Sequence, residues 1–200
     1  MMTAQYSPRL YQAFQFAAHE HRCQLRKDTT IPYISHLMSV SALVMENGGD
    51  EDQAIAGLLH DVIEDADPPS RVPEIRQAIE TQFGARVLRL VEGCTDGIAD
   101  NTGVKPLWRP RKEAYLKHLK DEPVELLLVS CCDKLHNARA ILTDLTTIGN
   151  TVFDRFSGKR EGTLWYYKEL VTIFEKHLPN VVAVRELGTT VDGIVRLASS

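Results

Sequence analysis

The sequence predicts an all-α protein built as a bundle of several helices. Apolar residues recur at intervals of three and four along most of the chain, which is the period of an amphipathic helix. The apolar run 126–132, LLLVSCC, could form a buried strand, but apolar residues continue at helical spacing from Leu135 to Leu145 and favour one long buried helix. The chain shows no alternation of strands and helices, so a nucleotide-binding sheet is not expected.

Helix boundaries are well marked in the first third of the chain. The Ser7-Pro8 pair supplies a capping residue and a proline at the first helical position. A second helix is expected to end at the Gly48-Gly49 pair, because glycine favours helix C-termini. Asp50 and Gln53 form a capping-box pattern, which predicts the start of a third helix that continues through Ile63.

Helix breakers divide the rest of the chain. The Pro68-Pro69 pair, Gly84 and Pro179 each end a helical pattern, and Thr95–Pro110 is rich in glycine and proline, which predicts a long loop. Loops of this length inside a compact domain are often functional. The predicted helices lie at about 8–21, 35–47, 50–63, 72–82, 85–94, 111–120, 123–148, 161–178 and in the last twenty residues.

Length and composition predict one globular domain over residues 1–200. Twenty-three Lys and Arg against 27 Asp and Glu give a net charge of −4, so the chain lacks the broad basic field that binds nucleic acid. No apolar run comes near the length of about 20 residues that a membrane-spanning helix needs, and the N-terminal MMTAQYSPRL has no apolar signal core. We therefore expect a cytoplasmic protein with no nucleic-acid or membrane partner; the sequence does not predict its oligomeric state.

The most informative segment is LLHDVIEDAD, residues 58–67. His60 and Asp61 are adjacent. Glu64 follows His60 by four positions, and Asp65 follows Asp61 by four positions. On a helix this spacing stacks His60 with Glu64 and Asp61 with Asp65, so four ionisable groups converge beside an apolar face. Burying these groups is costly unless a positive charge lies among them, and a divalent cation would supply that charge.

Two other residues are the best candidates for further metal ligands. His36 lies in PYISHL at the start of a helix, and Asp133 lies in SCCDKLHN, in the middle of a buried apolar run. An aspartate at such a position is hard to explain as core packing, so it either binds a cation or pairs with a base. Four of the other histidines, His19, His21, His118 and His177, are expected to be ordinary surface or core residues.

In the order H…HD…D, here His36, His60-Asp61 and Asp133, the chain resembles the HD superfamily of metal-dependent phosphohydrolases. The similarity is closer still to the alarmone pyrophosphohydrolases, which cleave guanosine tetra- and pentaphosphate in the stringent response. The matching stretches occur in order over about residues 10–145: HRCQLRKDTTIPYISHL, AIAGLLHDVIEDAD, FGARVLRLVEGCTD and CDKLHNARAI.

This resemblance implies an all-helical HD domain with one Mn²⁺ ion and a set of site residues. Glu64 and Asp65 would position or activate the attacking water. The implied metal ligands are His36, His60, Asp61 and Asp133, and the implied substrate contacts are Arg26, Lys27, Lys134, Asn137 and Arg139. Tyr166 lies in a helix that would border the nucleotide pocket and could stack on a base, although core packing is the simpler explanation.

Cations must also line a site that takes a polyphosphate. Lys112 belongs to a basic cluster with Lys105, Arg109 and Arg111 that could close over phosphates, or that could form a solvated basic turn. The hypothesis is then a Mn²⁺-dependent hydrolase that releases pyrophosphate from the 3′ position of guanosine 3′-diphosphate 5′-di- or triphosphate. Two alternatives remain open: another nucleotide substrate, such as an adenosine alarmone or the 2′-phosphate of NADPH, and a sensor that binds the nucleotide without turnover.

Overall fold

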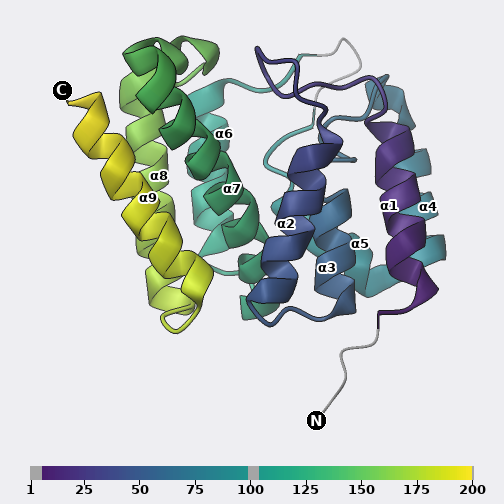
Figure 1. Cartoon of the computed structure of the whole chain (residues 1–200). Coiled ribbons are helices and arrows are strands. Elements are labelled where there is room, and N and C mark those ends of the chain that lie inside the picture. The colour runs from purple at the N-terminus through teal and green to yellow at the C-terminus, as the bar shows by residue number, and fades with distance from the viewer. Residues whose placement is uncertain (1–5, 99–103, 200) are drawn as a thin grey trace. The chain divides into compact units, whose positions relative to one another are not determined.

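The protein is helical, as predicted, over the residues that the computed structural model describes, 6–98 and 104–199. Within these ranges the helices are joined by turns and loops and no β-strand is formed; one isolated bridge joins Leu25 and Pro32. The chain divides into two compact units, Met1–Lys105 and Pro106–Ser200. Figure 1 shows the helices of both units in chain order, from purple to yellow.

In the first unit, α3 is the central helix. It packs against α1, α2 and α5, and every residue of it from Gln53 to Leu59 is buried. The capping box predicted at its start is present: Asp50 accepts a hydrogen bond from the amide of Gln53, and the Gln53 side chain accepts one from the amide of Asp50, both at 3.0 Å. The elements are α1 (Pro8–Glu20), α2 (Ile34–Glu46), α3 (Glu51–Leu59), the 3₁₀ helix η1 (Pro69–Arg71), α4 (Val72–Phe83) and α5 (Ala85–Cys94).

Close packing of α2 on α3 depends on Gly57. A Cβ atom at this position would lie 3.0 Å from the Cα and 3.1 Å from the amide nitrogen of Ser41, and backbone atoms cannot move aside as a flexible side chain can. The Ser41 hydroxyl also donates a hydrogen bond to the carbonyl of Ala54, at 2.8 Å. Helix α2, which carries His36, and helix α3, which ends just before His60, are therefore held at a fixed separation.

Replacing Gly57 with alanine is expected to lower the free energy of unfolding by about 1–3 kcal/mol, the usual effect of overpacking a core. Urea denaturation of the two proteins measures the difference. Gly188→Ala is the control, because a Cβ there would meet only side-chain atoms at 3.6 Å or more. A Gly57→Ala protein as stable as the parent would contradict this account of the α2–α3 contact.

The second unit is organised around α7, which packs against α9 and η2, while α8 packs against α6 and α9. The run 126–132 lies inside α7 and is fully buried, so the strand alternative is wrong and the long helix is confirmed. The glycines at 158 and 162 leave room for the ring of Trp108, which a Cβ at either position would approach within 3 Å. The elements are α6 (Trp108–Leu119), α7 (Val124–Ile148), the 3₁₀ helix η2 (Gly149–Arg155), α8 (Lys159–His177) and α9 (Val182–Ala198).

Two predicted boundaries are wrong. The third helix ends at Leu59 rather than Ile63, and residues 60–65 form successive turns. A physical reason is that Nδ1 of His60 bonds to the carbonyl of Gly57, at 2.9 Å, and so competes for the acceptor that helix continuation requires. The predicted loop Thr95–Pro110 is shorter than expected because α6 begins at Trp108; residues 99–103 of it lie outside the described ranges.

Among the helices of the described ranges, none combines the length and the apolarity needed to cross a lipid bilayer.

Candidate metal centre

His60 and Asp61 lie in the turn that follows the buried helix α3. His60 is 1% exposed, and its Nδ1 donates a hydrogen bond to the carbonyl of Gly57. Its other ring nitrogen, Nε2, lies 2.9 Å from Oδ2 of Asp61. The end of α3 therefore fixes both the position and the orientation of this imidazole.

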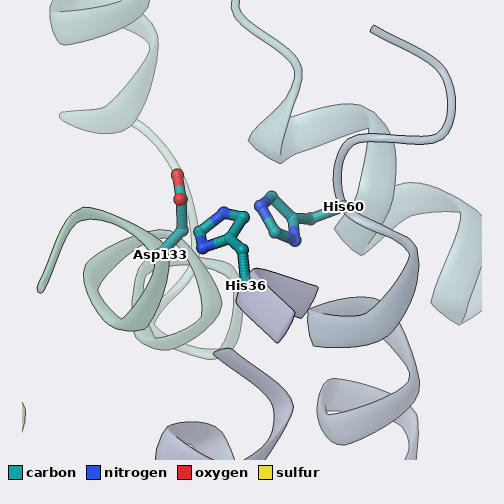
Figure 2. A group of neighbouring side chains, drawn as sticks. All are labelled: His36, His60 and Asp133. Carbon is teal, nitrogen blue, oxygen red and sulfur yellow. The ribbon is translucent and has the colours of Figure 1, made fainter. Parts of the chain in front are cut away.

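His36 adds a second imidazole to the same group from the first turns of α2. The residue is fully buried, its ring centroid lies 5.1 Å from that of His60, and its Nε2 lies 3.6 Å from Oδ2 of Asp61. One carboxylate oxygen thus faces the Nε2 atoms of two imidazoles. The rings of both histidines, and the carboxylate of Asp133 on α7, are drawn in Figure 2.

This arrangement fits a divalent cation. An imidazole that donates from Nδ1 is, when neutral, an acceptor at Nε2, and the Asp61 carboxylate is also an acceptor. A metal ion held by these two atoms would make their short separation favourable, and a backbone bond to the second ring nitrogen is the usual support of a metal-binding histidine. Imidazole nitrogen and carboxylate oxygen together suit manganese, iron or zinc.

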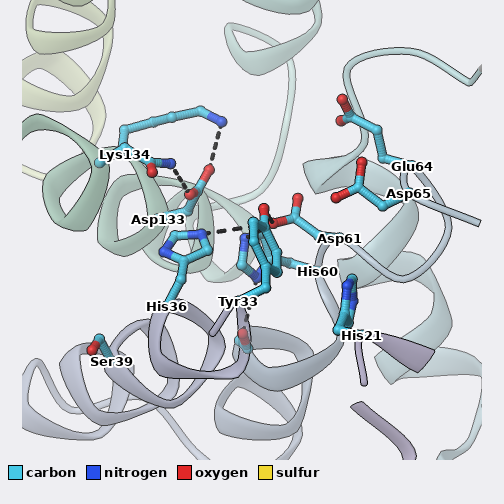
Figure 3. Close-up of polar contacts among 12 residues, drawn as sticks. His21, Tyr33, His36, Ser39, His60, Asp61, Glu64, Asp65, Asp133 and Lys134 are labelled. Atoms are coloured by element: carbon cyan, nitrogen blue, oxygen red, sulfur yellow. Dashed lines mark hydrogen bonds and ion pairs between the residues drawn. The ribbon is translucent and has the colours of Figure 1, made fainter. Parts of the chain in front are cut away.

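Glu64 and Asp65 occupy the last turns of the same segment, beside a lysine from a distant part of the unit. Nζ of Lys105 lies 2.8 Å from Oε1 of Glu64 and 3.5 Å from Oδ1 of Asp65. The amide of Asp96 donates to the other oxygen of Glu64, at 3.3 Å. Figure 3 shows both acidic side chains with Asp61 on this stretch of chain. The predicted acidic cluster is therefore present, although the backbone that carries it is a series of turns.

Burial changes the proton affinity of both acids. Desolvation, together with the nearby carboxylate of Asp96, raises the pKa of Glu64 above its ordinary value of 4.5, and Lys105 opposes this shift. Desolvation and the charge of Asp61 likewise raise the pKa of Asp65 above 3.8, while the hydrogen bond from Gln24 lowers it. A carboxylate with a raised pKa is a stronger base, which suits a group that must take a proton from water.

Asp133 is buried in the second unit, on the middle of α7. Its Oδ2 lies 2.5 Å from Nζ of Lys134, and its Oδ1 accepts a hydrogen bond of 2.6 Å from the side-chain amide of Asn137. The ammonium group of Lys134 also lies over the ring of Tyr115. Three residues predicted from one motif thus form one hydrogen-bonded group, and Lys134 supplies a counter-charge for the buried aspartate.

The other predicted substrate contacts lie on several elements. Arg26 lies 5.9 Å from the ring centroid of Tyr33, and Lys27 is exposed in the hairpin that the Leu25–Pro32 bridge closes between α1 and α2. Nζ of Lys112 lies 4.8 Å from the ring centroid of Tyr166. Tyr166 is buried, so core packing describes its position better than an open stacking surface does. Arg139 is paired with Glu186 of α9, at 2.7 Å.

The sequence predicted none of the contacts that hold the acidic groups. Gln24 donates to Asp65, at 2.8 Å, and Lys105 pairs with Glu64 although the sequence pointed only to a basic loop. Tyr33 donates from its hydroxyl to Asp61, at 2.6 Å, as Figure 3 shows. These contacts join residues at least 28 positions apart, so helical periodicity carries no signal for them; position beside the RK and YISH motifs is the only hint.

Comparisons with known proteins agree with the geometry. The model of the HD-domain family matches residues 13–164. The guanosine-3′,5′-bis(diphosphate) 3′-pyrophosphohydrolase of Mus musculus is 38% identical over 133 residues, which cover 65% of this chain and 68% of that protein. A probable enzyme of the same name from Synechocystis is 37% identical over 131 residues, 64% of this chain but only 16% of that much longer protein.

Two solved structures have similar folds. A metazoan orthologue of SpoT, described as hydrolysing ppGpp, has a TM-score of 0.72 and 25% identity, with 97% of each chain covered. A protein from Listeria monocytogenes has a TM-score of 0.66 at 22% identity, with 80% of this chain and 99% of that one covered. The second likeness bears on the fold alone, and both agree with an all-α chain.

Proposed function

Because the chain belongs to the HD-domain family, we propose that it is a metal-dependent guanosine-3′,5′-bis(diphosphate) 3′-pyrophosphohydrolase. The observation that carries this proposal is the group of buried His36 and His60 with half-buried Asp61, followed one turn further on by Glu64 and Asp65. The relatives bearing that name support the choice of substrate. One HD domain over residues 1–200 is the proposed organisation, since the family model draws on both compact units.

The proposed metal ligands are His36, His60, Asp61 and Asp133. Two neutral imidazoles and two carboxylates neutralise a divalent ion, and Mn²⁺ is the proposed metal because this mixed nitrogen and oxygen set suits it. The ion would supply Lewis acidity and a water of lowered pKa. Asp133 is included on its burial and on its place in the H…HD…D order, and Lys134, which pairs with it, is a proposed substrate contact.

Glu64 and Asp65 are the proposed proton acceptors. One of them takes a proton from the attacking water as its oxygen bonds to the phosphorus atom attached to the 3′ oxygen, and the bond between that phosphorus and the 3′ oxygen breaks. The 3′ oxygen gains a proton, so one water is consumed and GDP, or GTP, and pyrophosphate are formed. Lys105 pairs with both carboxylates and would hold them in place before the substrate binds.

Substrate binding is proposed to use cationic side chains, with a small nucleotide rather than a nucleic acid as the partner. Such a charged nucleotide does not cross a bilayer unaided, which supports a cytoplasmic setting. The proposed contacts are Arg26, Lys27, Lys112, Lys134, Asn137, Arg139 and Tyr166. Among these, Lys134 and Asn137 have the strongest support because they already contact a proposed ligand, Asp133.

Product analysis tests the proposal. Metal-free protein reconstituted with Mn²⁺ is incubated with guanosine tetraphosphate, and the nucleotides are separated by ion-exchange chromatography while pyrophosphate is measured enzymatically. Equal amounts of GDP and pyrophosphate are expected. Orthophosphate release would indicate a phosphatase instead, turnover of only an adenosine alarmone or of NADPH would replace the substrate, and binding without any turnover would indicate a sensor.

A further inference from the structure

We propose that His21 and Gln24 are positioning residues that hold the Asp65 carboxylate in the orientation needed to accept a proton from water, an inference that rests on the proposed hydrolase function. Both residues come from the turn between α1 and α2, far from Asp65 in sequence. Neither is a proposed ligand or substrate contact. Their action on the reaction would pass entirely through Asp65.

The contact between Gln24 and Asp65 has only one chemically reasonable orientation. The Asp65 carboxylate, when ionised, can only accept hydrogen bonds, so the amide of Gln24 must present its NH₂ group, and Nε2 lies 2.8 Å from Oδ2. The carbonyl oxygen of the same amide then faces the other way. It lies 2.6 Å from Nδ1 of His21, which must carry a hydrogen in order to donate to it.

His21 is well suited to fix this orientation. The residue is 4% exposed and stacks on Tyr33, with ring centroids 5.1 Å apart and planes at 28°. Its Nε2 is buried and has no hydrogen-bond partner among the described residues, so Nδ1 is the ring nitrogen through which His21 contacts Gln24. A rigid, buried imidazole thus sets the rotation of the Gln24 amide, and the amide sets the rotation of the carboxylate.

The same short segment holds the acid that precedes Asp65 by one turn. The hydroxyl of Tyr33 donates to Asp61, at 2.6 Å, and the amide of Tyr33 donates to the carbonyl of Gln24, at 2.9 Å. Gln24 and Tyr33 are therefore tied together through the backbone while their side chains hold Asp65 and Asp61. The spacing between the proposed ligand and the proposed base is fixed from outside the turn that carries them.

A fixed carboxylate matters more for the reaction than for substrate binding. Loss of a positioning bond lets Asp65 rotate toward Lys105, whose Nζ already lies 3.5 Å from its other oxygen. The carboxylate would then accept from the ammonium group rather than from water. Such a change slows proton transfer in the transition state and leaves ground-state binding intact, so it lowers kcat and leaves KM in place.

The test is a pair of variants assayed with Mn²⁺ and guanosine tetraphosphate. Gln24→Met keeps the length and volume of the side chain and removes both hydrogen bonds, and we expect kcat to fall about 10- to 100-fold with KM and Mn²⁺ affinity within about twofold of the parent. Gln53→Met is the matched control: it removes the bond from the Asp50 amide to the Gln53 side chain, which is one half of the capping box of α3, so it should lower thermal stability and leave kcat unchanged. Unchanged kcat in Gln24→Met, or an equal loss in Gln53→Met, overturns the proposal.

A double-mutant cycle tests whether His21 acts through Gln24. His21→Phe keeps an aromatic ring against Tyr33 and removes the donor, so kcat should fall by a smaller factor than in Gln24→Met. In the Gln24→Met background the same change should have no further effect on kcat, because the amide that it orients is gone. Independent, multiplying losses would show that His21 does not act through this amide.

A measurement on the metal-free protein separates this inference from the proposed function. The side-chain amide protons of Gln24, followed by ¹H–¹⁵N NMR, should be shifted downfield by the charged acceptor and should move upfield in Asp65→Asn. This result holds for the contact even if the parent protein fails to turn over guanosine tetraphosphate, in which case only the substrate assignment is wrong. An amide signal that ignores Asp65→Asn overturns the positioning role itself.

Discussion

Asp61→Ala is expected to abolish detectable Mn²⁺ binding and to lower hydrolysis at least about a thousandfold, because the metal contributes several kcal/mol to such reactions. Oδ2 of this residue faces the Nε2 atoms of both His60 and His36, so no other side chain of the turn can take over its place. Isothermal titration of Mn²⁺ into metal-free protein, with product analysis alongside, measures both effects.

The control for Asp61→Ala is Asp192→Ala, which removes the same charge from an exposed position on α9. Its metal affinity and rate should equal those of the parent. Asp61→Ala also removes the acceptor of the Tyr33 hydroxyl, so its thermal stability must be recorded to exclude unfolding. Parent-like Mn²⁺ affinity in folded Asp61→Ala protein would rule out the proposed ligand set.

Glu64→Gln is expected to lower kcat about 10²- to 10⁴-fold while Mn²⁺ affinity stays close to that of the parent. Glutamine keeps the shape and can still accept from Lys105, but it cannot take a proton from water. The rate loss therefore falls on the chemical step. If Glu64→Gln kept full activity, Asp65 alone would be the base.

The same variant should make the metal-free protein more stable, in a pH-dependent way. The folded-state pKa of Glu64 is raised above its ordinary value, so the folded protein binds a proton more tightly than the unfolded chain does. The cost of ionising Glu64 in the folded protein is absent below about pH 4.5. It grows as the pH rises through the folded-state pKa, because the desolvated carboxyl group must then lose its proton. Glutamine carries no such charge, so its advantage should increase over the same pH range.

Urea denaturation of metal-free protein at several pH values measures this difference. Glu80→Gln, at an exposed position on α4, provides the control and should leave the stability close to that of the parent. A Glu64→Gln protein that loses stability relative to the parent as the pH rises would mean that the ion pair with Lys105 outweighs desolvation. A stabilised but inactive variant would indicate that the site is maintained at a cost to the fold.

Local signals in the sequence were sufficient for the fold class, and the spacing of His60, Asp61, Glu64 and Asp65 was sufficient to group these side chains on one segment. Caps such as Asp50 with Gln53, and the helical period through α7, act over a few residues and are visible in any window. The turn at His60 was not predictable in this way, because the apolar period continues to Ile63 and only a side-chain bond to Gly57 opposes it. The pairing of Lys105 with Glu64 depends on the folded path of the chain between them.

The hairpin between α1 and α2 has a stem that is fixed by backbone bonds and an exposed tip that is not. Its stem is fixed by the Leu25 and Pro32 bridge and by the bond from the Arg26 amide to the Ile31 carbonyl, at 2.8 Å. Its tip, residues 27–30, is mostly exposed and contains Asp28 with a positive φ of 54°. Changes of length or charge at the tip should therefore leave the acids in register. Substitutions intended to change the substrate preference are therefore best made first at residues 27–30, where they should not disturb the acidic side chains.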